Sequence, residues 1–138
     1  MSHKTQRKVR IRIDDAGGSL VDISRDVDSW RLARTAEILE TSTLGDSDRS
    51  HLPGLCGAAL LLGGPFNDAA PQTDAILFDA LGSSVARTVE VGVDARYYHF
   101  EAVVARYTLG GSLDAPGLVT WEAALQVSGA VNRTSVAL

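Results

Sequence analysis

The chain has 138 residues, 45% of them hydrophobic and 22% charged, and a formal net charge of −4. This length suits one domain around a single core, and the single cysteine excludes an internal disulfide framework and a cysteine-rich metal site. The acidic balance argues against a dedicated nucleic-acid binder, because affinity for phosphates comes from clustered lysine and arginine.

The sequence also has no apolar run near the roughly 20 residues that cross a bilayer, and no apolar stretch follows its N-terminus. We therefore expect a protein that is made in a cytoplasm and has no membrane anchor. Thirteen glycines indicate many turns and favour β structure over a helix bundle.

The N-terminal part is predicted to form two strands after a flexible lead-in at residues 1–6. Apolar and basic side chains alternate there, with Val9, Ile11 and Ile13 on one face and Lys8, Arg10 and Arg12 on the other. This two-residue period predicts a half-buried strand. Its basic face either protects an edge strand from mispairing or grips an anion, and we favour the first. A turn at 14–18 then leads into a short strand at 20–24.

Two further strand pieces are predicted at 27–32 and 36–41, separated by a turn or a bulge at 33–35. The next strand is predicted at 57–62, where a continuous run of small and apolar residues is typical of a strand covered on both faces. Glycines and a proline at 63–68 are predicted to end it.

A long polar loop is predicted between these strands, at residues 41–55. Its sequence, TSTLGDSDRSHLPGL, offers only Leu44, Leu52 and Leu55 as apolar points, so it has little to bury against its own domain. We predict that it becomes ordered on a neighbouring copy of the same protein. The candidate contact residues are Thr43, Leu44, Asp46, Asp48, Arg49, His51, Leu52 and Pro53.

One helix is predicted at 73–82. Thr73 can cap it, Asp74 suits its positive N-terminal end, and Gly82 suits its C-terminal end. At two to three turns such a helix is marginal alone, so we expect it to pack on a sheet or on the mouth of a barrel.

The C-terminal third returns to a two-residue period. Alternating residues predict strands at 89–93 and 98–104, and the segment 118–128 alternates most clearly, with Trp121 on its apolar face. We predict an antiparallel hairpin between 98–108 and 118–128, joined by a flexible connection at 109–117. Residues 131–138 are either a last short strand or an extended tail.

Three phrases resemble the tail tube proteins of long-tailed bacteriophages and related phage-like particles. They are KVRIRIDDAGGSLVDIS at 8–24, ETSTLGDSDRSHLPGLCGAALLLGG at 40–64 and WEAALQVSGAVNRTS at 121–135. The resemblance covers nearly the whole chain and is weaker at 63–68.

The resemblance implies a mainly β fold, a single β-sandwich or barrel-like domain over residues 1–138 with one flanking helix and a long inter-strand loop. It further implies hexameric rings that stack into a tube, contacts with other tail proteins, and a central channel that conducts DNA without binding it tightly. The place implied is the tail of a virion, after synthesis in the cytoplasm of a bacterial host.

Candidate catalytic groups are few. Cys56 and His51 could form a thiol and its base, but Cys56 begins an apolar strand and is better explained as a small buried residue. The three histidines show no metal-ligand spacing, and no nucleophile elbow or phosphate loop is present. We therefore predict no enzyme, no cofactor and no metal. The alternative to an assembling tube subunit is a β-sandwich binding module for a carbohydrate or a protein partner.

Overall fold

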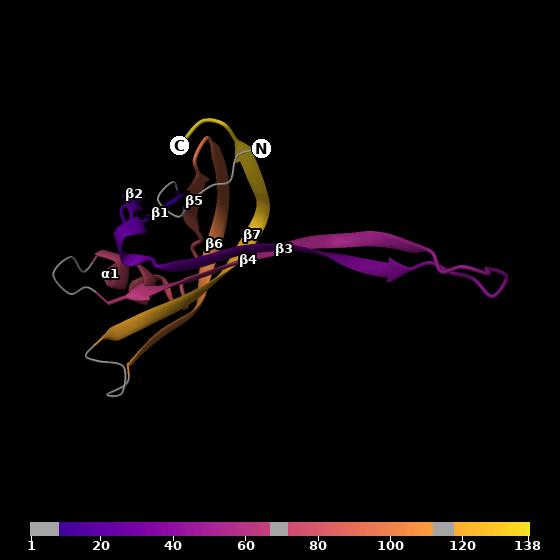
Figure 1. The fold of residues 1–138 in the computed structure, drawn as a ribbon, viewed down its shortest axis with the longest axis horizontal. Helices are drawn as coiled ribbons and strands as arrows, with labels where there is room; N and C mark the ends of the chain where they lie inside the picture. Colours follow the sequence, from indigo (N-terminus) through magenta and orange to yellow (C-terminus); the bar gives the residue numbers. More distant parts are fainter. Residues whose placement is uncertain (1–8, 67–71, 112–117) are drawn as a thin grey trace.

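The computed structural model describes residues 9–66, 72–111 and 118–138. Within these residues seven strands form one antiparallel sheet, in the order β2-β1-β5-β6-β7-β4-β3, flanked by one α-helix (Figure 1). The elements are β1 (Val9–Asp14), β2 (Leu20–Asp22), the 3-10 turn η2 (Ser24–Asp26), β3 (Ser29–Glu40), β4 (His51–Pro65), α1 (Gln72–Ala80), β5 (Arg87–Val93), β6 (Arg96–Gly111) and β7 (Val119–Thr134).

The connection from β2 to β3 shows that this sheet is rolled. In a flat sheet the two outer strands would lie six spacings of about 4.8 Å apart, about 29 Å. The chain from Asp22 to Ser29 spans at most about 25 Å when fully extended, and part of it is coiled as η2. The backbone N–H of Ile11 donates to Ser24 Oγ (2.8 Å), and that of Asp28 donates to the Gly63 carbonyl (2.9 Å). This connection therefore bridges β1 and β4, and the predicted barrel-like fold is confirmed.

The core fills the inside of the roll, and α1 contributes Ile76, Leu77 and Ala80 to it. Trp121 is at its centre, 2% exposed, and its Nε1 donates to the Asp26 carbonyl at 3.1 Å. The strands supply most of the other buried side chains, including Ile11, Ile13, Leu60, Leu62, Val89, Val91, Phe100, Ala102, Val104 and Leu125.

The predicted helix is present, but it begins at Gln72 and ends at Ala80 instead of running from 73 to 82. Thr73 is inside the helix, and its hydroxyl donates to Asp26 Oδ2 at 2.6 Å instead of capping the helix. The chain turns after Ala80 through Gly82, whose φ of 79° suits glycine. Tyr107 O–H donates to Asp74 Oδ1 at 2.7 Å and ties the helix to β6.

The strands around the predicted loop are longer than expected. The pieces at 27–32 and 36–41 are one strand, β3, without a break at 33–35, and the irregularity comes between Ala36 and Ile38. Residues 51–55, predicted as loop, are strand, because they pair with β3. The strand was predicted to end after residue 62, but β4 continues to Pro65, because Gly63, Gly64 and Pro65 pair with β7.

Two smaller expectations also change. The strand predicted at 20–24 is limited to Leu20–Asp22 and is followed by η2. The strand predicted at 57–62 is not covered on both faces, because Leu61 is 41% exposed.

The C-terminal hairpin is confirmed. β6 pairs with β7 from Tyr97↔Thr134 to Gly111↔Val119, and the alternation predicted for Trp121 and its neighbours holds. β7 continues to Thr134, so the segment at 131–138 begins as strand. The lead-in predicted at 1–6 and the middle of the connection predicted at 109–117 lie outside the described residues.

Candidate assembly interface

The most prominent surface feature is a two-stranded ribbon, the arm, at residues 35–57. Here β3 and β4 pair with each other, while β4 pairs with β7 only from Ala59 onward. Figure 1 shows the arm reaching far from the body of the molecule. An isolated two-stranded ribbon is marginally stable in water at best, so the arm has little within its own chain to stabilise it.

The tip of the arm, residues 41–50, has hydrogen bonds of its own. The Thr41 N–H donates to the Ser50 carbonyl (2.8 Å) and the Thr43 N–H to Asp46 Oδ2 (2.7 Å). The Ser50 N–H donates to Ser42 Oγ (2.6 Å). The tip therefore forms local turns of its own, and its ordering on a neighbouring copy stays a prediction.

Both faces of the arm carry exposed apolar side chains. Leu39 stands opposite Leu52, and Ile38 stands opposite Pro53. Because successive residues of a strand point to opposite faces, these two pairs lie on opposite sides of the ribbon. Leu44 at the tip is fully exposed. Uncovered apolar groups on both sides are typical of a segment that packs between other subunits.

All eight predicted contact residues lie on the arm and are exposed. The tip holds Thr43, Leu44, Asp46, Asp48 and Arg49, and β4 holds His51, Leu52 and Pro53. Arg49 forms an exposed ion pair with Glu40 at 3.9 Å, which contributes little to stability.

A second surface feature was not predicted: a four-stranded panel whose two edges pair with no further strand among the described residues. The panel consists of residues 29–34 of β3, 58–65 of β4, 119–127 of β7 and 103–111 of β6. Within the described ranges, β3 pairs with β4 alone, and β5 pairs with β6 only as far as Ala102. The sequence holds one signal for the open edge of β6: the strand predicted at 98–108 is longer than the neighbouring strand predicted at 89–93, so part of it is left without a partner.

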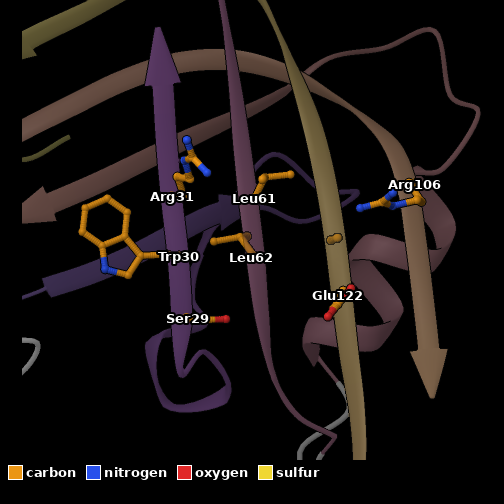
Figure 2. Close-up of a pocket in the computed structure, with 8 residues that line it drawn as sticks. Ser29, Trp30, Arg31, Leu61, Leu62, Arg106 and Glu122 are labelled. Atoms are coloured by element: carbon orange, nitrogen blue, oxygen red, sulfur yellow. The ribbon is translucent and has the colours of Figure 1, made fainter. Parts of the chain in front are cut away.

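The face of the panel opposite the core has a shallow hollow of about 240 Å³ (Figure 2). Arg31, Leu61, Ala124 and Arg106 form one row across the four strands, because each is in register with the next. Glu122 lies between β4 and β6 on the same side. This row places an arginine near each edge of the panel.

On the predicted basic face of β1, Arg10 and Arg12 each have an acidic partner, and Lys8 lies outside the described residues. Arg12 Nε donates to Glu90 Oε1 (2.8 Å), and Arg10 lies 3.6 Å from Asp22. Glu90 is 2% exposed and also contacts His99 Nε2 (3.1 Å) and the Leu138 N–H (2.8 Å). Burial alone would raise the pKa of Glu90, but the Leu138 N–H and the Arg12 guanidinium outweigh it and lower that pKa.

The surroundings of Cys56 do not support a thiol nucleophile with His51 as its base. Cys56 is exposed on the arm opposite Ala36, so its predicted burial is wrong. His51 begins β4 opposite Glu40, and His99 contacts Glu90. Over the part of the chain that the structure describes, no group of His, Cys, Asp and Glu is placed to hold a metal ion. No helix among those residues has the length and apolar character to cross a membrane.

The aromatic residues offer no platform for a sugar. Among the described residues, Trp121 is buried, Trp30, Tyr97, Tyr98 and Tyr107 are half-buried, and Phe78 on α1 is 64% exposed. One exposed ring makes no stacking platform, so the alternative of a sugar-binding module is not favoured.

Solved structures with the same fold come from tails and tubes. One is the tail of an empty gene transfer agent particle with C6 symmetry, with a TM-score of 0.77 and 22% identity over 96% of this chain and 99% of that chain. A second is the SPP1 tail tube, with a TM-score of 0.77 and 14% identity over 97% and 80%. A third is a sheath-tube complex of an extracellular contractile injection system, with a TM-score of 0.67 and 13% identity over 94% and 89%.

No protein-family model matches the sequence, and the search of curated proteins gives no significant match. The structural matches confirm the predicted tail-tube fold.

Proposed function

We propose that this chain is the structural subunit of a tail tube, in which six copies form a ring and rings stack around a channel for DNA. It acts by assembly and not by catalysis, and its place is the tail of a virion or phage-like particle. The observation that carries the proposal is the panel with two unpaired edges. The tail neighbour with C6 symmetry supports the number of copies.

The panel edges suit a closed ring because the two edge strands, β3 and β6, can pair between copies in the antiparallel sense used within the sheet. β3 is antiparallel to β4, β4 to β7, and β7 to β6, so β3 and β6 run in opposite directions. The β6 edge of one copy can therefore pair with the β3 edge of the next in the same antiparallel sense. Repeating one such contact gives a head-to-tail interface that closes into a ring. It also removes two long open edges, which would otherwise promote aggregation.

The arm supplies the second type of contact in this proposal. Its two apolar pairs, Leu39 with Leu52 and Ile38 with Pro53, suit a ribbon that lies between neighbouring copies or adjacent rings. Leu44 and Leu52 are the proposed anchors. Other tail proteins would meet the tube at its ends, as the baseplate and cap assemblies among the neighbours suggest.

Adjacent proline substitutions in β6 test the edge contact. Successive N–H groups of a strand point to opposite edges, so one of Thr108→Pro and Leu109→Pro removes a donor from the free edge and the other removes a donor to β7. We expect one variant to melt like the parent yet form no rings by negative-stain microscopy, and the other to melt at a lower temperature. Rings of normal yield from both variants would refute the edge contact.

A further inference from the structure

The row across the panel contains two arginines without an acidic partner. Over the residues that the structure describes, Arg31 and Arg106 form no ion pair, like the exposed Arg25 and Arg34 and unlike Arg10, Arg12 and Arg49. Both side chains are exposed and line the hollow on the panel face (Figure 2). Exposed guanidinium groups without a carboxylate partner are available to bind an anion.

We propose that Arg31 and Arg106 contact the phosphates of DNA on the channel side of the panel. This inference rests on the proposed tube, in which one panel face must line the channel. The core and α1 cover the other face, so the face with the hollow is the one left to line the channel. The row runs across the strands, and the same two arginines recur in every copy around the ring.

The position of the arginines places charge at each junction between copies. Arg31 is on the β3 edge and Arg106 on the β6 edge, and these are the two edges that meet in the proposed ring. Within one copy the two Cα atoms are about 14 Å apart, three strand spacings. Arginine matches phosphate geometry with paired N–H donors and stays charged at any working pH.

Glu122 keeps this contact weak. Its carboxylate lies in the same hollow, so each copy presents two guanidinium groups and one carboxylate there. Partial cancellation lowers the affinity for phosphate and lets a strand move past successive rings. The acidic net charge of the whole chain, −4, therefore does not describe the surface that DNA meets.

The test measures binding of a short fluorescein-labelled single strand of DNA to assembled tubes by anisotropy, over a series of salt concentrations. Tubes of the double variant Arg31→Gln/Arg106→Gln should bind at least about tenfold more weakly than parent tubes. The salt dependence should flatten, since each lost phosphate contact changes the slope by about 0.7. Arg25→Gln, a matched charge change at an exposed site on η2, should bind like the parent.

A second variant, which removes a negative charge instead of a positive one, keeps the test decisive if the double variant does not assemble. Glu122→Gln removes the competing carboxylate and should tighten binding several-fold. Parent tubes that bind DNA no better than the double variant, or Glu122→Gln tubes that bind more weakly, would overturn the phosphate contact while leaving the tube intact. A parent that forms neither rings nor tubes would overturn the proposed function itself, and the channel contact with it.

Discussion

At the scale of single residues, Trp121 connects three elements through one side chain. Its ring is 2% exposed, its Nε1 donates to the Asp26 carbonyl, and Tyr107 packs against it with ring centroids 6.3 Å apart. Tyr107 in turn holds α1 through Asp74. Loss of the indole therefore removes apolar contacts and also leaves the Asp26 carbonyl without that partner.

We expect Trp121→Ala to lower the free energy of unfolding by about 3–5 kcal/mol, the usual cost of deleting a large buried aromatic side chain. The measurement is urea unfolding of the monomeric protein, before it assembles. Leu44→Ala is the matched control, because Leu44 is fully exposed at the tip of the arm, and it should leave the midpoint unchanged. A parent-like midpoint for Trp121→Ala would contradict the assigned core.

Glu90 is a buried carboxylate whose charge is balanced by named donors. Its folded pKa is lowered from the ordinary value of 4.5, so the ionised form binds its partners in the folded state. Such a group stabilises the fold at pH values above its unfolded pKa, and this contribution is lost as pH falls through the folded pKa. The sensitive window therefore lies below about pH 4.5.

We expect Glu90→Gln to be less stable than the parent at neutral pH by about 1–3 kcal/mol, because it weakens charge-assisted hydrogen bonds to Arg12 and Leu138. The difference between the two proteins should shrink on acidification below about pH 4.5, since the parent loses its own carboxylate charge there. Parallel urea titrations at several pH values measure it. A difference that stays constant down to low pH would contradict the role given to Glu90.

At the scale of elements, the junction of η2 with β4 fixes how the sheet closes. Gly64 pairs with Trp121 in β7 and lies against the backbone of Asp26, where an added Cβ would overlap the carbonyl oxygen. The Asp28 N–H donates to Gly63 in the same place. Two glycines thus let the β2–β3 connection pass close over β4.

We expect Gly64→Ala to destabilise the fold by about 1–3 kcal/mol or more, because relief of the overlap requires η2 to move away from β4. Gly45→Ala is the control, since nothing lies near its added Cβ at the tip of the arm. Thermal melting of the two variants beside the parent measures the difference. Equal melting temperatures would show that η2 can shift without cost.

The strands of the body were predictable because each buries one face. Alternation identified β1, β5, β6 and β7, and helical spacing identified α1. The arm followed neither period, since a ribbon exposed on both sides needs no alternation between apolar and polar residues. Pro53 and Gly54 indicated a turn, yet Pro53 stands in β4, where its outer edge has no partner strand in the described structure and a proline is tolerated.

The candidate contact residues stay a prediction, and the structure shows that they share one exposed segment. The sequence marked residues 41–55 by their polarity, and the structure places the eight predicted residues on one exposed arm. The panel edges could not be predicted in the same way, because an edge depends on which strands lie side by side and not on local composition. The row of Arg31 and Arg106 likewise appears only once β3 and β6 are placed at opposite edges.

At the scale of the whole molecule, the arm should be needed for assembly and not for folding. Residues 35–57 are exposed along nearly their whole length, and they pair only with one another. Replacing them with Asn-Gly, which joins Arg34 to Ala58 by a tight turn, should therefore leave the melting temperature of the monomer close to that of the parent. A shorter change, Asn-Gly in place of residues 42–49, removes Leu44 but keeps Leu39 opposite Leu52.

The variant that removes more apolar surface should lose more of its ability to assemble. A contact repeated around a ring and between rings multiplies a small loss at each site. We therefore expect no tubes from the armless variant and fewer or shorter tubes from the variant without the tip, by sedimentation and microscopy at matched concentration. Tubes of normal yield from the armless variant would refute the role of the arm in assembly. A variant that melts far below the parent would show instead that the arm stabilises its own domain.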